Sequence, residues 1–382
     1  MRLHINGVGM VRGGGETHLD AFVRALIEVR PNWDVFLYAS RSGREISVPG
    51  VQTEYVNRSS WRRIGWDSTT VGRRAGGAGA DVLLNMANYG PVHSPVPSVL
   101  YQANTKYFDR AWVRRMSRTQ GAMAFLRREL AFMAMRDSAA VVVPSKAMGD
   151  YLRSWRGCPR FVSIEVVPHG INLDRFRFVP TPRSNRVRIV ALGDEYPHKD
   201  HGLLVDMMGE LRRREVEAIL ELTVRNDDSL RHVAALRERI RATGLEKRIR
   251  LVGRVDAPSF LADADVMVMP SVTESFGFPI LEAMASGVPV VASSIPATME
   301  LLGDLGSYFP VGDAIAAADG VVSILEADPS KIRLQVESAR EVACRYTWEA
   351  NARRIAGLIE SVAETARGVD EGDLDDAADL TN

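Results

Sequence analysis

Cysteine, long apolar runs and net charge are all scarce in this chain of 382 residues. Cys158 and Cys344 are its two cysteines, so a disulfide scaffold is excluded and a reducing compartment is favoured. No apolar run approaches the roughly 20 residues that a membrane-spanning helix needs. The first residues read directly as a strand, so we expect no signal peptide and a cytoplasmic protein.

The formal charge of zero is a cancellation between two unlike halves of the chain. Residues 1–180 contain 25 Lys and Arg against 14 Asp and Glu, whereas residues 181–382 contain 23 against 34. Six of the acids lie in residues 368–382, a segment without basic residues that we predict to be a disordered acidic tail. The total disfavours a nucleic-acid-binding protein, and the basic first half fits an anionic partner of another kind.

Short apolar runs alternate with amphipathic stretches in both halves, which predicts an α/β protein. Residues 178–186 contain two prolines and no periodicity, which is typical of a linker. We therefore predict two doubly wound parallel-sheet domains, residues 1–177 and 187–346, followed by a helix over residues 347–367 that returns to the first domain. The predicted strands are Leu3–Asn6, Asp34–Ala39, Val51–Val56, Asp81–Met86, Ser98–Gln102, Ala140–Pro144, Ile164–Val167, Val187–Leu192, Ala218–Val224, Ile249–Val252, Val266–Met269 and Pro289–Ala292.

The most informative segment is Pro270–Pro289, which follows an apolar strand at the edge where open α/β sheets bind ligands. Gly277 lets the backbone approach a ligand, and the helix predicted after it would direct the positive end of its dipole there. Glu274 and Glu282 are spaced so that both can face one cleft. Carboxylates repel phosphate but accept hydrogen bonds from hydroxyls, so the segment favours a ligand with both groups. Two solvated glutamates remain the simpler interpretation of the spacing alone.

Two other loops follow predicted strands. Gly193 ends one strand, and the loop after it delivers Lys199, whose charge suits a phosphate. The loop before the first helix contains several glycines, but Arg12 occupies the third glycine position and breaks the dinucleotide-binding pattern that begins at Gly7. The backbone amides of this loop could still contact an anion or a sugar.

Together these segments resemble the family 4 (group 1) glycosyltransferases, which have the GT-B fold of two Rossmann-like domains facing across a cleft. The resemblance rests on the Glu274-x7-Glu282 segment, Val167–Asn172, Tyr196–Lys199 and the glycine loop that ends at His18. It implies a retaining hexosyltransferase of bacterial carbohydrate or glycoconjugate biosynthesis. Such an enzyme moves a mannose- or glucose-like sugar from a nucleoside-diphosphate sugar to a hydroxyl acceptor.

The resemblance also implies a role for each matching residue. Lys199 would bind the donor diphosphate, Glu282 would hold the nucleotide ribose and Glu274 would face the transferred sugar, with Asn104 as a further catalytic residue. The other donor-side residues would be Gly14, Gly15, Gly193, Arg254, Ser275, Phe276, Gly277 and Phe278, and the acceptor side would include His18 and Tyr107.

Two positions depart from the family pattern. Asp194 stands where an arginine is common, which weakens the charge pairing of the donor unless Arg254 compensates. Asn104 stands where a histidine is common, and asparagine cannot act as a base. These departures leave two alternatives open: a pseudo-glycosyltransferase or epimerase-like enzyme, and a catalytically silent protein that binds nucleotide sugars.

The same resemblance implies a reaction without a metal ion or cofactor. The histidines are scattered, and Asp263-Ala264-Asp265 precedes a buried strand rather than following one, so the sequence predicts no metal site. No nucleophile is apparent on the reacting face. We therefore expect a front-face mechanism in which the departing phosphate takes the proton of the acceptor.

Residues 107–136 combine seven arginines with many large apolar residues. One interpretation is a basic amphipathic helix that docks on anionic lipid at the inner leaflet and brings a lipid-linked acceptor within reach. The other, which the sequence favours, is a long helix that covers the first domain with its arginines in solvent. The acceptor therefore stays open among saccharides, lipid-linked molecules and small molecules, and the oligomeric state stays open as well.

Overall fold

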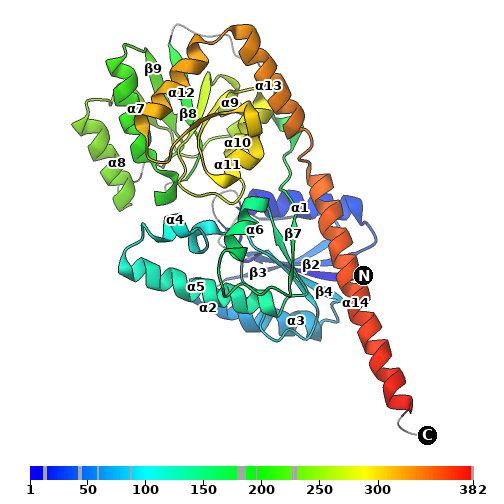
Figure 1. The fold of residues 1–382 in the computed structure, drawn as a ribbon. Helices are drawn as coiled ribbons and strands as arrows, with labels where there is room; N and C mark the ends of the chain where they lie inside the picture. Colours follow the sequence, from blue (N-terminus) through cyan, green and yellow to red (C-terminus); the bar gives the residue numbers. More distant parts are fainter. Residues whose placement is uncertain are drawn as a thin grey trace. The chain divides into compact units, whose positions relative to one another are not determined.

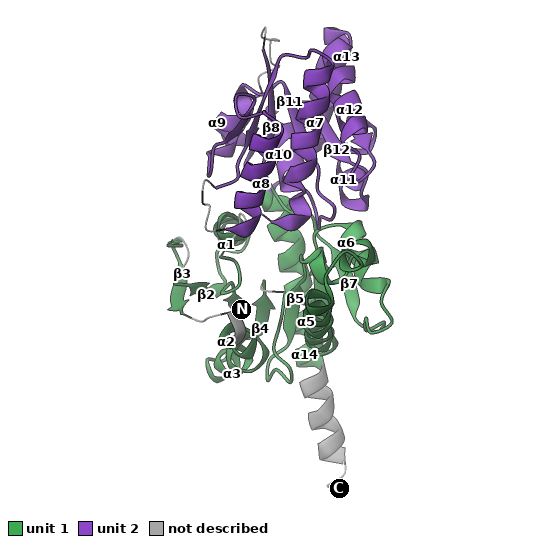
Figure 2. Ribbon diagram, turned by 90° about the vertical axis from the view of Figure 1, so that its left-hand side faces the viewer, with its two compact units in different colours: residues 1–170, 348–382 green, residues 171–347 purple. Residues whose placement is uncertain are grey.

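The fold is described from a computed structural model of the chain, over residues 1–11, 15–41, 45–57, 60–86, 88–178, 186–194, 196–225, 227 and 230–379, without the side chains of 60, 61 and 369–379. The chain forms two compact units, Met1–Gly170 with Trp348–Asn382, and Ile171–Thr347 (Figure 2). The units divide before the predicted linker at 178–186. The reason is that Ile171 and Phe176 are buried in a core of the second unit, so the chain has already entered it.

Unit 1 contains a seven-stranded parallel sheet with the order β3-β2-β1-β4-β5-β6-β7 (Figure 1). Its strands are β1 (Arg2–Asn6), β2 (Asp34–Ser40), β3 (Val51–Val56), β4 (Val82–Asn85), β5 (Ser98–Tyr101), β6 (Ala140–Val143) and β7 (Ser163–Val166). Every residue of β4, β5 and β6 is buried, which explains their unbroken apolar sequences. The helices are α1 (Gly15–Val29), α2 (Ser60–Gly65), α3 (Val71–Gly77), α4 (Arg110–Val113), α5 (Arg118–Arg136), α6 (Lys146–Arg153) and α14 (Trp348–Asp379), with the short turns η1 (Trp66–Thr70) and η2 (Thr105–Tyr107).

Helix α14 packs along α1 in unit 1, although the whole of unit 2 lies between the two helices in sequence. Ala352, Ile355, Ala356 and Ile359 recur with helical spacing, and all are almost completely buried against the apolar face of α1. The helix extends to Asp379, beyond Gly368, where the sequence predicted that a disordered tail begins. No proline follows Trp348, so the backbone can continue as a helix past Gly368.

Unit 2 contains a six-stranded parallel sheet with the order β10-β9-β8-β11-β12-β13 (Figure 1). Its strands are β8 (Val187–Ala191), β9 (Ala218–Leu222), β10 (Ile249–Leu251), β11 (Val266–Met269), β12 (Val290–Ser293) and β13 (Ser307–Phe309). The sequence did not predict β13, which is short and has no apolar run. The helices are α7 (His201–Arg213), α8 (Arg231–Ala242), α9 (Ala257–Ala262), α10 (Phe278–Ser286), α11 (Pro296–Leu302), α12 (Ala314–Glu326) and α13 (Pro329–Ala343), with the turns η3 (Leu173–Arg175), η4 (Pro197–Lys199) and η5 (Gly303–Leu305).

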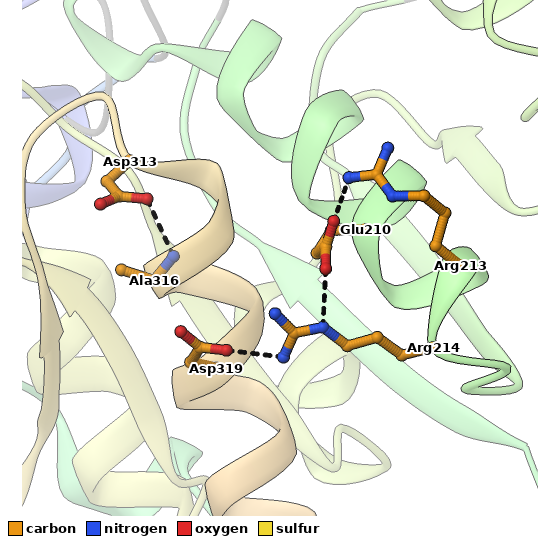
Figure 3. Close-up of polar contacts among 6 residues, drawn as sticks. All are labelled: Glu210, Arg213, Arg214, Asp313, Ala316 and Asp319. Atoms are coloured by element: carbon orange, nitrogen blue, oxygen red, sulfur yellow. Dashed lines mark hydrogen bonds and ion pairs between the residues drawn. The ribbon is translucent and has the colours of Figure 1, made fainter.

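Polar contacts join α7 to α12 over the apolar core of unit 2 (Figure 3). Glu210 pairs with both Arg213 and Arg214, and Arg214 Nη1 also lies 2.6 Å from Asp319 of α12. Asp313 caps α12 by accepting a hydrogen bond of 2.9 Å from the backbone N–H of Ala316. Exposed ion pairs of this kind contribute about 0–1 kcal/mol each, so burial of the apolar helix faces holds the layer together.

The two parallel-sheet α/β units confirm the predicted fold class. Over the described residues, no helix has the length and apolar character needed to cross a bilayer.

Candidate active site

Two neighbouring strands of unit 2 bring opposite charges together at their carboxyl ends. The loop after β8 delivers Lys199, and the loop after β11 delivers Glu274, and these strands are paired in the sheet. The Nζ atom of Lys199 lies 2.6 Å from Oε1 of Glu274. Their side chains are only 14% and 12% exposed, so water screens the pair weakly. Lys199 and Glu274, both predicted from sequence, therefore form one ion pair.

Gly193 gives Lys199 its position. A Cβ atom at residue 193 would lie 3.2 Å from Cδ of Lys199, so the absence of a side chain makes room for the lysine stem. The backbone N–H of Gly193 donates to Oγ1 of Thr223 (2.9 Å), and that of Val272 donates to the carbonyl of His198 (2.8 Å). These bonds fix the Lys199 loop to its neighbours in the sheet.

Helix α10 begins at Phe278, four residues after Glu274. Gly277 precedes the helix with φ of 106° and ψ of 51°, a left-handed conformation that favours glycine. The ring of Phe276 is buried against Phe278 and Tyr346, with ring centroids 5.4 and 5.8 Å away. Of the predicted donor-binding segment, Ser275 and Phe278 keep partly exposed side chains, whereas Phe276 could contact a ligand only through its backbone.

Glu282 lies on α10, five residues after Gly277, and is only partly accessible. Burial raises the pKa of its carboxyl to about 7, and the positive charges of Arg175 and Lys199 oppose this rise. Arg175 pairs with Asp256, the N-cap of α9, at 2.7 Å. Sequence reasoning missed Arg175 and Asp256, since only their approach to Glu282 in space marks them.

Arg254, a predicted donor-side residue, has no polar contact with Lys199, Glu274 or Glu282. Its side chain is exposed, and it makes no hydrogen bond or ion pair with any described residue. The arginine whose charge acts on Glu282 is Arg175 instead.

The predicted residues of unit 1 occupy two places. Asn104 caps η2, where its Oδ1 accepts from the backbone N–H of Lys106 at 3.1 Å. The hydroxyl of Tyr107 accepts a hydrogen bond of 2.8 Å from Nη1 of Arg127, whose guanidinium also lies near the ring. Both side chains are partly exposed, so both are accessible to a ligand.

His18 belongs to a cluster of aromatic rings in unit 1. Its ring centroid lies 4.8 Å from that of His169 and 5.6 Å from that of Trp348. Burial lowers the pKa of His18 to about 3, so its imidazole is neutral at pH 7. Gly15 is the buried first residue of α1, and Gly14 lies outside the described residues. Any acceptor contact of His18 would therefore involve a neutral ring.

The described part of the chain holds no group of three or more His, Cys, Asp and Glu side chains arranged to bind a metal ion.

Two family models match the chain, one in each half. The model described as Glycosyltransferase Family 4 matches residues 12–175, and the one described as Glycosyl transferases group 1 matches residues 186–327. Phosphatidyl-myo-inositol mannosyltransferase of Mycobacterium leprae is 30% identical over 233 residues, which cover 58% of this chain and 60% of that protein. Mannosylfructose-phosphate synthase of Agrobacterium fabrum is 27% identical over 216 residues, which cover 52% of this chain and 47% of the relative.

Solved structures match over almost the whole chain. Sucrose-phosphate synthase from Thermosynechococcus elongatus has a TM-score of 0.76 and 18% identity, and the match covers 96% of this chain and 100% of that one. The Anabaena protein HepE, in complex with UDP and glucose, has a TM-score of 0.72 and 18% identity, over 94% and 99% of the two chains. At this identity the likeness establishes the GT-B fold alone. Because the two family models together match most of both halves, the chain belongs to the family 4, or group 1, glycosyltransferases.

Proposed function

We propose that the protein is a retaining hexosyltransferase. It moves a mannose- or glucose-like sugar from a nucleoside-diphosphate sugar to a hydroxyl acceptor, without a metal ion or other cofactor. The observation that carries the proposal is the shielded Lys199–Glu274 pair at the carboxyl ends of β8 and β11. The names of similar proteins support the sugar class, since one relative is a mannosyltransferase and one similar structure holds UDP and glucose.

The charges of the site match the bonds that change in such a reaction. The bond from the anomeric carbon to the diphosphate oxygen breaks, and its electron pair stays on the diphosphate. The ammonium of Lys199 has three N–H donors, so it can bond to Glu274 and to a phosphate oxygen at once. Together with the N-terminus of α10 it would stabilise the leaving group, while Glu274 stabilises the positive charge on the sugar.

The acceptor oxygen then bonds to the anomeric carbon on the face that the diphosphate leaves. Its proton passes to the departing phosphate oxygen, so no protein base is required. This fits Asn104, which can hold a sugar hydroxyl by hydrogen bonds but cannot accept its proton.

The nucleotide would lie beside Glu282. A carboxylate accepts hydrogen bonds from ribose hydroxyls, and Arg175 is the cation whose charge acts most strongly on Glu282. In this proposal Arg175 supplies the positive charge that is missing at Asp194, the role that the sequence predicted for Arg254.

A panel of nucleotide sugars tests this function. We expect one nucleoside diphosphate to raise Tm by mass action, and its sugar to release free nucleoside diphosphate only when an acceptor is present. The product should keep the anomeric configuration of the donor, and EDTA should leave the rate unchanged. Binding without turnover would favour the silent alternative, and an altered donor sugar without acceptor would favour the epimerase-like one.

We further propose that unit 1 contacts an anionic membrane surface through α4 and α5. The inner face of α5 covers the core with Phe132 and Met135, as the sequence favoured. Its outer face, however, exposes Phe125 (56%) and Leu126 (45%) together with Met123 and Met133. Exposed arginines flank these apolar side chains, namely Arg110, Arg114, Arg115, Arg118 and Arg136. Such a face combines apolar insertion with attraction to anionic lipid.

Sedimentation with anionic vesicles tests this contact. The wild-type protein should bind vesicles at low salt and bind them several-fold less at high salt, because salt screens the arginines. The double variant Phe125→Ala/Leu126→Ala should lose most of the binding. Leu334→Ala removes an apolar side chain of unit 2 that is more exposed (66%) and should bind as the wild type does. Absence of binding at low salt would contradict the proposal.

A further inference from the structure

Three polar side chains are completely buried at the carboxyl ends of the central strands in unit 1. Asn6 ends β1 and Asn85 ends β4, the two strands between which the strand order reverses. Open α/β sheets bind their ligands at this point. Asp67 joins them from η1, a single π-helical turn, and such turns are frequent at functional sites. All three side chains are 0% exposed.

Asn6 connects Asp67 to the start of the glycine loop. Its Nδ2 donates to Oδ1 of Asp67 (2.9 Å) and to Oδ1 of Asn85 (3.3 Å). Its Oδ1 faces the other way and accepts from the backbone N–H of Val8 at 3.4 Å. If the amide turned over, the hydrogen bonds at both ends would be lost. The carboxyl group of Asp67 therefore fixes the orientation in which Asn6 holds Val8.

The turn after β1 is short and tightly bonded. Gly7 donates its backbone N–H to the carbonyl of Tyr38 (2.9 Å), and Met10 donates to the carbonyl of Gly7 (2.9 Å). The π-helical turn is held in place by Trp66, whose ring meets that of Tyr38 edge-on at 5.6 Å. Movement of Asp67 would thus be transmitted to residues 7–10, and from there toward Gly15 at the start of α1.

Two atoms of the cluster formed by Asn6, Asp67 and Asn85 lack a hydrogen bond. Oδ2 of Asp67 and Nδ2 of Asn85 have no hydrogen-bond partner among the described residues, and Nε of Arg63 is 3.7 Å from Oδ2. Buried polar atoms without partners are rare in folded proteins and call for an explanation beyond stability. An apolar group at this place would pack without that cost, so the polar groups point to a role in the site.

We propose that Asp67 is a positioning residue of the transferase, which holds the first turn of the glycine loop through Asn6. The inference rests on the proposed function and on the acceptor side that the family resemblance implies for His18, which lies on α1 directly after this loop. Asp67 touches neither substrate. Its effect should appear in acceptor use and kcat far more than in donor affinity, because Lys199 and Glu282 of the proposed nucleotide site lie in unit 2 and do not depend on Asn6.

Kinetics of matched variants test the proposal. Asp67→Ala should lower kcat/KM for the acceptor by about 10-fold or more, as expected when reacting groups are misplaced, whereas the Kd for the nucleoside diphosphate should change much less. Asp67→Asn keeps an oxygen that can accept from Asn6 and should recover most of this loss. Asn6→Ala should match Asp67→Ala, and the double variant should add nothing, because both act through one contact.

Ser98→Ala is the control, since Ser98 is also buried in unit 1 and its hydroxyl has no hydrogen-bond partner among the described residues. It should keep or raise stability without changing acceptor kinetics. Hydrogen exchange of residues 7–11 gives a readout that needs no activity: Asp67→Ala should accelerate it and Ser98→Ala should not. Unchanged exchange or additive kinetic effects would overturn the proposal. Faster exchange in a protein without transferase activity would overturn the proposed function alone. If Asp67→Ala does not fold, Asp67→Asn and Asn6→Ala carry the same comparison.

Discussion

Replacing Lys199 by alanine should lower kcat by about 10²-fold or more, as expected when a preorganised charge on a leaving group is lost. The ammonium is held at 2.6 Å from Glu274 and is largely shielded from water, so no solvent cation replaces it. Lys199→Arg should restore little, because the wider guanidinium does not fit the narrow space over Gly193. Release of nucleoside diphosphate under saturating donor and acceptor measures the effect.

Glu274→Gln should cause a loss of similar size, since the carboxylate faces the developing positive charge of the sugar. Each single variant leaves the other partner with an uncompensated charge, which could lower stability as well as the rate. The Tm of each single variant is therefore compared with that of the double variant Lys199→Ala/Glu274→Gln. Lys247→Ala changes an exposed lysine of unit 2 and should keep wild-type turnover. Near-wild-type rates in both single variants would remove this pair from the mechanism.

Donor affinity should rise with pH, and Glu282 should be the cause. Burial raises the pKa of Glu282 to about 7, so the neutral acid dominates at pH 6 and the carboxylate at pH 8. The carboxylate is the stronger acceptor of ribose hydroxyls, so the Kd of the nucleoside diphosphate should fall by about 10-fold over this range. Glu282→Gln should weaken binding at pH 8 and remove the pH dependence. Glu246→Gln, at an exposed position, should behave as the wild type does.

Glu282 should also make the protein less stable as pH rises, whereas donor affinity increases. The pKa of Glu282 in the folded state lies above its ordinary value of 4.5, so the folded protein binds more protons than the unfolded chain between these values. The free energy of unfolding should therefore fall as pH rises from about 4.5 to about 7. Burial also raises the pKa of Asp67 to about 7, so Glu282→Gln should remove one part of the slope and Asp67→Asn another. An unchanged slope in both variants would contradict this account.

Local patterns in the sequence were sufficient to predict every strand except β13, because a parallel sheet covered on both faces requires continuous apolar runs. β6 and β11 are examples: each is a four-residue apolar run, and every residue in it is buried. β13 escaped prediction because its three residues, Ser307–Phe309, include a serine and two aromatic residues and form no aliphatic run. The units divide between Gly170 and Ile171, before the prolines that the sequence offered as a linker. Prolines mark a turn in the backbone, whereas the packing of Ile171 and Phe176 decides which core they join.

By itself, the sequence determined the α/β class, because apolar runs and amphipathic stretches are local patterns. It also marked Lys199, Glu274 and Glu282 as candidates, through residue types at short spacings and their resemblance to a family pattern. Only the tertiary structure decided which side chains meet. Lys199 and Glu274 are 75 residues apart and form a pair because β8 and β11 are adjacent in the sheet. The neutral ring of His18, the charge of Arg175 beside Glu282 and the link from Asp67 through Asn6 likewise depend on burial and strand order. Those arise from packing between distant segments, which no local pattern records.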